Sequence, residues 1–160
     1  MANREIIDNY YNKAVENLNE NIISNYKHWN KYVENLSEKQ KATYLISIFH
    51  DQVFNGGFHQ YFLNPYGCFS YQTLSCLKKI KAKTTANLLL EVLSVVNYLN
   101  LDVQDFSRNI FNRELNRITN FDDLICDSLD GLDDKYYNSK EDLVKLLANY
   151  LTSDGASMSE

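Results

Sequence analysis

Four aspartates near the carboxyl end have a spacing that would bring their carboxylates together. They are separated by intervals of four, three and four residues, in the order Asp123, Asp127, Asp130 and Asp134. At about 100° per residue they fall within roughly 60° on one side of a helix. Unpaired carboxylates in such a row would attract the Lys and Arg side chains of a partner protein.

The negative charge of the chain is concentrated in the same region. The formal net charge is −5, yet residues 1–120 carry 13 Lys/Arg against 11 Asp/Glu, whereas residues 121–160 carry 3 against 10. Aspartate is a poor helix former, and like charges four residues apart cost about 0.2–0.5 kcal/mol per pair. Stability alone therefore does not favour the row. A solvated acidic helix face without a partner is the alternative interpretation.

The expected partner-binding face extends beyond the row to neighbouring aspartates. It comprises Asp122, Asp123, Asp127, Asp130, Asp133 and Asp134. An apolar stripe on the opposite side would dock the helix: Phe121, Leu124, Ile125, Leu129 and Leu132. If Gly131 ended the helix, Asp133 and Asp134 would turn elsewhere, and one of them would cap the next segment of the chain.

The charge density of one row is lower than that of DNA. Four charges over eleven residues correspond to roughly one per 5.5 Å of helix, whereas one DNA strand carries a phosphate per about 3.4 Å of axis. To approach the charge density of DNA, further acidic residues, or the same row in a symmetry mate, would have to add negative charge beside this row. The nearby acids available for this are Asp122, Asp133, Glu141 and Asp142.

The residue types that enzymes use do not form a recognised motif. The three histidines, His28, His50 and His59, have no zinc-ligand spacing, and the acidic pairs at 122–123 and 133–134 have no EF-hand pattern around them. The chain also has no P-loop, GxGxxG or GxSxG sequence. We therefore expect no catalytic residue, metal or cofactor, and a protein that is not an enzyme.

Composition favours an all-α protein. The chain has 1 Pro and 5 Gly in 160 residues, too few for the many turns of a sandwich or barrel. We expect one compact helical domain over residues 1–151, with about six to eight helices joined by short loops, and a frayed polar tail over residues 152–160.

Other features indicate a cytoplasmic location. The amino-terminal residues are polar, and the most apolar stretch, residues 88–99, is too short to span a membrane. Three cysteines without a CxxC pair predict reduced, mostly buried thiols: Cys68, Cys76 and Cys126. The short basic cluster at 78–83 is interpreted as a solvated helix end, so no direct contact with nucleic acid is expected.

Periodicity places several helices. Apolar residues at steps of three and four predict a first helix from Ile7 to Tyr26, and a capping-box pattern at Ser37 predicts a second helix from Glu38. Residues 88–99 are apolar nearly all round, which predicts a central helix. The run Ser139–Asp142 is expected to cap a last helix.

Two glycines interrupt the second helix. Asn55-Gly56-Gly57 follows its apolar stripe, and Phe58, Tyr61 and Phe62 restart the helical spacing, which predicts a helix, a tight elbow and a short aromatic helix ending at Asn64-Pro65. The phenylalanines would fill the core. Side-chain amides of Gln52, Asn55 or Gln60 would bond the amides of the turn. The open alternative is that Gln60, His59 and Tyr61 line a small-ligand cleft.

The run from Asn55 to Asn64, Asn-Gly-Gly-Phe-His-Gln-Tyr-Phe-Leu-Asn, resembles the signature of a bacterial DNA-mimic-protein domain family. The similarity covers roughly residues 35–151 and includes Leu129, Leu132, Asp133, Asp134, Tyr136 and Tyr137. The family often has an acid at the position of Gln52. The resemblance implies an all-helical fold, a homodimer and an acidic surface that imitates DNA and binds DNA-binding proteins, either transcription regulators or histone-like proteins.

The sequence supports three functional hypotheses. The first is an acidic interaction module that imitates DNA and binds a basic protein. The second is an immunity-type or regulatory protein that binds its partner through an apolar patch and is insensitive to salt. The third is a small-ligand-binding helical domain with a polar cavity behind the Gly56-Gly57 elbow.

Overall fold

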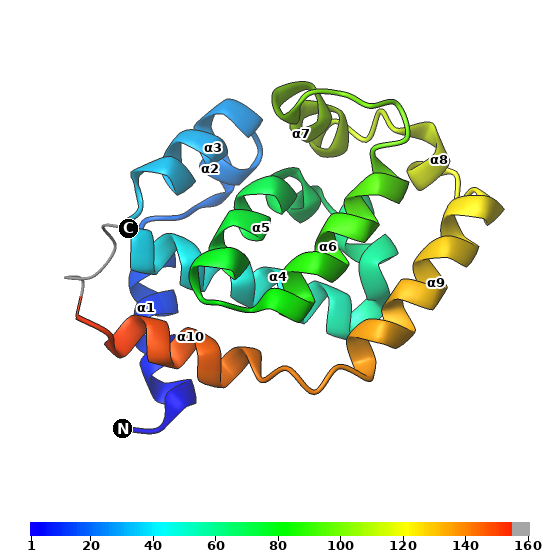
Figure 1. Cartoon of the computed structure of the whole chain (residues 1–160). Helices are drawn as coiled ribbons and strands as arrows, with labels where there is room; N and C mark the ends of the chain where they lie inside the picture. The colour runs from blue at the N-terminus through cyan, green and yellow to red at the C-terminus, as the bar shows by residue number, and fades with distance from the viewer. Residues whose placement is uncertain (155–160) are drawn as a thin grey trace.

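The computed structural model describes residues 1–154, and within that range it consists of helices and connecting loops without a strand (Figure 1). This confirms the all-α prediction. The expected tail lies outside the described residues from 155 onward. The helices in chain order are α1 (Asn3–Val15), α2 (Glu20–Ile23), α3 (Tyr26–Asn35), α4 (Glu38–Leu63), the 3-10 helix η1 (Pro65–Phe69), α5 (Ser70–Lys79), α6 (Lys83–Val96), α7 (Val103–Phe111), α8 (Asn116–Thr119), α9 (Asp123–Tyr137) and α10 (Leu143–Thr152).

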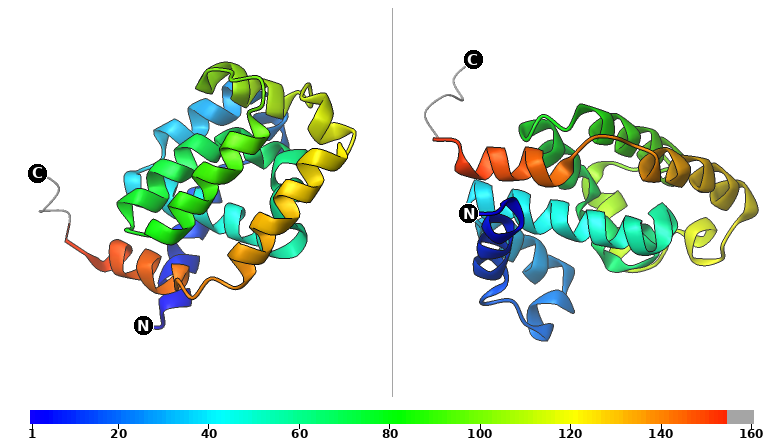
Figure 2. Two further views of the ribbon diagram at one scale, coloured as in Figure 1. Left: turned by 45° about the vertical axis from the view of Figure 1, so that its right-hand side comes forward. Right: turned by 90° about the horizontal axis from the view of Figure 1, so that it is seen from below.

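Helix α4 crosses the middle of the molecule, and α1, α5, α9 and α10 pack around it (Figures 1 and 2). It begins at Glu38, as the capping box predicts. The Ser37 hydroxyl accepts from the Gln40 amide at 3.2 Å, and the Gln40 side-chain oxygen accepts from the Ser37 amide at 3.1 Å. These bonds satisfy two amides that helix geometry leaves without an internal partner.

The core is rich in aromatic side chains contributed by distant parts of the chain. Trp29 of α3 packs edge-on against Phe69, with ring centroids 4.9 Å apart, and its indole N–H donates to the Tyr44 hydroxyl of α4 at 3.1 Å. Both Trp29 and Tyr44 are buried. The indole and phenol groups are therefore buried with their polar atoms paired, which ties the amino-terminal helices to α4.

The prediction of one long first helix is wrong. The segment is divided into α1, α2 and α3, and an asparagine begins each new piece: Asn19 accepts from the Ile22 amide at 3.2 Å and Asn25 from the His28 amide at 3.1 Å. Asparagine side chains compete with the helical backbone for such amides and so favour helix starts. The apolar spacing persists because Leu18, Ile22 and Tyr26 still face the same core.

Helix α6 packs against α5 on one side and α9 on the other. Leu88, Leu89, Val92 and Val96 are buried, but Leu90 is exposed, so this helix is not enclosed on all sides. Helix α9 lies along one edge of the molecule and continues through a loop into α10, which reaches back to α1 (Figures 1 and 2). No helix within the described part of the chain has the length and apolar character needed to cross a membrane.

Candidate functional site

The elbow predicted at Gly56-Gly57 is present as a kink within α4. Gly57 has φ 75° and ψ −179°, and Gly56 has φ −150° and ψ 20°, so neither residue is helical. The backbone angles of Gly57 lie in a region that is essentially restricted to glycine. Because the kink interrupts the i→i−4 ladder, backbone groups beside it need partners from elsewhere.

Helix α9 supplies two of these partners. The Asp133 carboxylate accepts from the Phe58 amide at 2.7 Å, and one turn later the Tyr137 hydroxyl donates to the Val53 carbonyl at 2.8 Å. The prediction that Gln52, Asn55 or Gln60 would bond the turn amides is therefore wrong for Phe58. A Cβ on Gly57 would lie 2.3 Å from the Asp133 carboxylate, so the close approach of α9 also requires glycine.

The signature side chains instead join the two halves of the bent helix. The Gln52 side-chain oxygen accepts from the Gln60 amide group at 3.2 Å and from the Asn64 amide group at 2.7 Å. The Asn55 amide group donates to Gln60 at 3.3 Å. Phe58, Tyr61 and Phe62 are buried in the core, as expected.

Asp133 does not belong to an outward acidic face. It is half-buried and turned toward the elbow. Burial raises the pKa of its carboxyl group, the Phe58 amide bond offsets part of this rise, and the charges of Asp130 and Asp134 add to it. The Asp133 carboxylate therefore points toward the elbow and not toward solvent. The prediction that it belongs to the partner-binding face is wrong.

Asp122 has a capping role. It precedes α9, and its carboxylate accepts from the Leu124 amide at 3.1 Å and the Ile125 amide at 3.3 Å. A carboxylate at this position also interacts favourably with the helix dipole. The sequence predicts Asp122 in the outward set, but its oxygen atoms are partly occupied by the start of the helix.

The remaining four aspartates form the row that their spacing predicts. Asp123, Asp127, Asp130 and Asp134 are all exposed on α9, which continues through Gly131 to Tyr137. Within residues 1–154, none of their carboxylates forms an ion pair or a side-chain hydrogen bond. The nearby Lys135 pairs with Glu91 of α6 instead, at 3.4 Å. We call these four residues the acidic row.

The other two acids expected to add charge beside the row, Glu141 and Asp142, are used in capping. Glu141 accepts from the Thr84 amide at 3.0 Å and from the Thr85 amide at 2.7 Å, at the start of α6. Asp142 caps α10 by accepting from the Lys145 amide at 3.0 Å, which confirms the predicted capping of the last helix. One protomer therefore presents a single row.

The opposite side of α9 is only partly as expected. Ile125, Leu129 and Leu132 are buried, but Leu124 is 75% exposed and Phe121 is 56% exposed. Phe121 precedes α9 with φ 54° and lies against the His59 ring, with centroids 4.3 Å apart. The prediction that Leu124 and Phe121 dock the helix is therefore wrong.

A second exposed aromatic group lies at the other end of α9. Phe54, on the outer side of the elbow, contacts Tyr137 with ring centroids 5.9 Å apart, and both side chains are exposed. Apolar side chains thus flank the acidic row at its two ends. This geometry provides an apolar surface next to a charged one.

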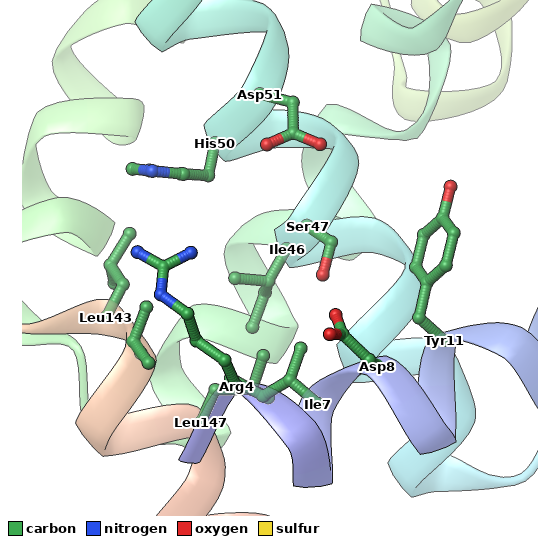
Figure 3. A pocket seen from close by; sticks show the side chains of 11 residues that line it. Arg4, Ile7, Asp8, Tyr11, Ile46, Ser47, His50, Asp51, Leu143 and Leu147 are labelled. Carbon is green, nitrogen blue, oxygen red and sulfur yellow. The ribbon is translucent and has the colours of Figure 1, made fainter. Parts of the chain in front are cut away.

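The polar groups expected to line a cleft behind the elbow are engaged in bonds. Gln52 and Gln60 bond each other, and the His59 ring nitrogen Nε2 lies 2.9 Å from the Ile118 carbonyl. A different cleft of about 280 Å³ lies between α1, α4 and α10, where Arg4, Asp8, Ser47, His50 and Asp51 surround an apolar floor (Figure 3). The described residues contain no group of three or more His, Cys, Asp or Glu that could hold a metal ion.

The cysteines show no sign of disulfide or metal chemistry. Cys68 and Cys76 are buried free thiols, and burial raises the pKa of both. Cys126 is a free thiol of intermediate exposure on α9. Thiols whose pKa is raised are poor nucleophiles at neutral pH.

Comparison with known proteins identifies the family. Residues 34–154 match the family model described as DMP19-like protein, which covers the elbow, the acidic row and α10 and leaves α1, α2 and nearly all of α3 outside. No curated protein and no solved structure matches the chain. Because the match spans most of the sequence and includes the signature run, the chain belongs to the DMP19-like protein family.

Proposed function

We propose that this protein is a non-enzymatic interaction module whose acidic row imitates the charge of a nucleic-acid backbone. Its partner would be the basic surface of a DNA-binding protein, a transcription regulator or a histone-like protein. The observation that supports this most directly is the exposure of four carboxylates on one helix without a neutralising side chain in the described chain. Family membership supports the same function.

The attachment of α9 to the elbow suits this role. Asp133 and Tyr137 bond backbone groups of α4 on either side of the elbow and so hold α9 in place. The carboxylates therefore have a fixed spacing before any partner binds. A preorganised charged surface avoids part of the entropy cost of association.

We also propose that the functional form is a homodimer. With Asp122, Asp133, Glu141 and Asp142 engaged in bonds, a second protomer is the remaining source of a parallel row of charges. The exposed Phe54–Tyr137 pair offers apolar area beside the row for such a contact. Sedimentation equilibrium would report a monomer mass if the proposal is wrong.

The test of the partner class is capture from lysate at low and at high salt. We expect the wild-type protein to retain basic DNA-binding proteins at low salt and to release them as salt screens the charges. The double variant Asp127→Asn/Asp130→Asn should lose this capture. Glu5→Gln/Glu16→Gln removes the same charge from exposed positions at the ends of α1 and should retain it.

A second candidate function is an immunity-type or regulatory contact made through the apolar groups. The exposed Phe54–Tyr137 pair is the observation that favours it. In that case capture would persist at high salt and in the Asp127→Asn/Asp130→Asn variant. It would be lost in Phe54→Ser, whose substitution lies on the exposed surface.

A further inference from the structure

The cleft between α1, α4 and α10 carries side chains of both charges around an apolar floor (Figure 3). Its volume of about 280 Å³ lies near the lower end of the range for small-molecule sites, about 300–1,000 Å³. Arg4 and Asp8 line it from α1, which lies outside the family match, whereas Ser47 and Asp51 belong to α4. The cleft is therefore formed where the amino-terminal helix packs on the family part of the chain.

The charged groups of this cleft have no partner in the described chain. Arg4, Asp8 and Asp51 form no ion pair, so no Arg4 nitrogen lies within 4.0 Å of an oxygen of either aspartate. Arg4 and Asp8 are one turn apart on α1, yet Figure 3 shows the guanidinium turned toward the His50 ring and the Asp8 carboxylate turned toward Ser47. The cleft therefore has a positive end and a negative end that do not neutralise each other.

The neighbouring histidine does not neutralise Asp51 either. Burial lowers the pKa of the His50 ring, the charge of Asp51 offsets part of this effect, and the charge of Arg4 adds to it. The ring nitrogen Nδ1 lies 2.6 Å from the Tyr136 hydroxyl and is engaged there. His50 is therefore a neutral wall of the cleft at pH 7, and Arg4 is the one cation among the described residues that line it.

The floor and the walls of the cleft suit an aliphatic group. Ile46 and Leu147 are buried and close the floor, and Ile7, Leu143 and Val144 form half-buried walls. A branched aliphatic side chain placed against these walls would remove its own surface and theirs from water.

The two charged ends together indicate what kind of molecule fits. A simple anion at Arg4 would be repelled by the two aspartates, and a simple cation at the aspartates would be repelled by Arg4. A molecule that carries both charges on a short frame would be attracted at both ends. The cleft is therefore better matched to a zwitterion than to an ion of either sign.

We propose that this cleft binds a free α-amino acid with a branched aliphatic side chain, such as leucine. Its carboxylate would pair with the Arg4 guanidinium, and its ammonium group would lie beside Asp8 and Asp51. Its side chain would contact Ile7 and Leu143. A guanidinium can bond a carboxylate through two parallel N–H groups, so the contact with Arg4 would orient the ligand. This site is separate from the acidic row and does not depend on the function proposed for it.

The experiment is a titration of the full chain, labelled with ¹⁵N, with L-leucine, followed by amide NMR shifts. We expect saturable shifts confined to α1, α10 and the first half of α4, with a dissociation constant on the order of 1 mM. Two analogues that each carry one charge are the controls. 4-Methylpentanoate lacks the ammonium group and leucinamide lacks the carboxylate, and each should bind at least about fivefold more weakly than leucine.

Two variants at exposed positions test the assigned contacts. Arg4→Gln should weaken leucine binding at least about fivefold and should not weaken the binding of leucinamide, which has no carboxylate to pair. Asp8→Asn/Asp51→Asn should weaken leucine binding by a similar factor and should not weaken the binding of 4-methylpentanoate. Glu5→Gln, an exposed position on α1 outside the lining of the cleft, should bind leucine as the wild type does.

Three results would overturn the proposal. They are the absence of saturable shifts at the cleft, shifts that instead follow α9 and vanish in the Asp127→Asn/Asp130→Asn variant, and leucine binding that is no tighter than the binding of the two analogues. A cleft that holds only water would give the first result.

Discussion

The two faces of α9 use the same side chain in opposite ways. Toward α4, Asp133 accepts the Phe58 amide and is half-buried, whereas toward solvent the acidic row has no partner in the described chain. The carboxylate on the inward face therefore stabilises the fold, whereas the carboxylates on the outward face are exposed and have no ion-pair partner. The comparison shows that the neighbouring backbone, and not the residue type, determines what a carboxylate contributes.

Gly57→Ala should have the largest effect on this comparison, because it disrupts the contact of the inward face. The substitution places a Cβ in a glycine-only conformation and 2.3 Å from Asp133. We expect the free energy of unfolding to fall by about 3 kcal/mol or more, from backbone strain and loss of the Phe58 bond. Urea denaturation measures this change.

Gly131→Ala is the matched control on the outward face. Gly131 is helical and exposed, and a Cβ there meets nothing within 4 Å. Alanine should stabilise the protein by up to about 1 kcal/mol because of its helix propensity. Equal effects at the two glycines would contradict the role assigned to the elbow.

Asp133→Ala should have the next largest effect. It leaves the buried Phe58 amide without an acceptor, which costs about 1–3 kcal/mol. Asp133→Asn keeps an oxygen at this position and should be much milder. Asp130→Ala, on the outward face, removes no bond, relieves two like-charge contacts and improves helix propensity, so it should be neutral or stabilising. If Asp133→Ala proved as mild as Asp130→Ala in urea denaturation, the inward bond would not stabilise the fold.

The sequence predicts the elements well where local chemistry decides them. The capping box of Ser37 and Gln40, the elbow at Gly57 and the helix through Gly131 depend on residues close in the chain. The prediction of a single first helix fails because periodicity does not reveal that Asn19 and Asn25 each begin a new helix. Such breaks require knowledge of which amides the asparagines reach.

For α9, helical periodicity predicts which side chains face the core but not which groups they bond. Asp133 lies about 40° from the buried Leu129 around the helix and Leu124 about 140° from it, so the angles are sufficient to place Asp133 inside and Leu124 outside. The partner of Asp133 cannot be predicted in this way, because Phe58 is 75 residues away in sequence. The bonds of Glu141 to the start of α6 are non-local for the same reason.

The pH dependence of the free energy of unfolding should reveal the burial of the Asp133 carboxylate. The pKa of Asp133 in the folded protein lies above its ordinary value of 3.8, chiefly because of burial, so protonation favours the folded state. Its stabilising contribution is full below the unfolded pKa and is lost as pH rises through the folded pKa. Asp133→Asn does not titrate at this position. Its free energy of unfolding relative to that of the wild type should therefore increase as pH rises from the unfolded pKa of Asp133 to its folded pKa. Urea denaturation at several pH values across this interval, for both proteins, tests this. A constant difference would mean that Asp133 is not desolvated.

The smallest expected effect concerns repulsion within the acidic row. Asp127 has Asp123 and Asp130 as neighbours on its helix face, and Asp130 also has Asp134, so Asp127→Asn/Asp130→Asn removes three like-charge contacts. At low ionic strength this should raise the free energy of unfolding by about 1 kcal/mol. The gain should nearly vanish at about 1 M salt, where the Debye length is about 3 Å.

Glu5→Gln/Glu16→Gln, with the same change in net charge at separated positions, should show no comparable gain. If both double variants behaved alike in urea denaturation at low salt, the four carboxylates would not act on one another, and the outward face of α9 would carry dispersed charge instead of a row.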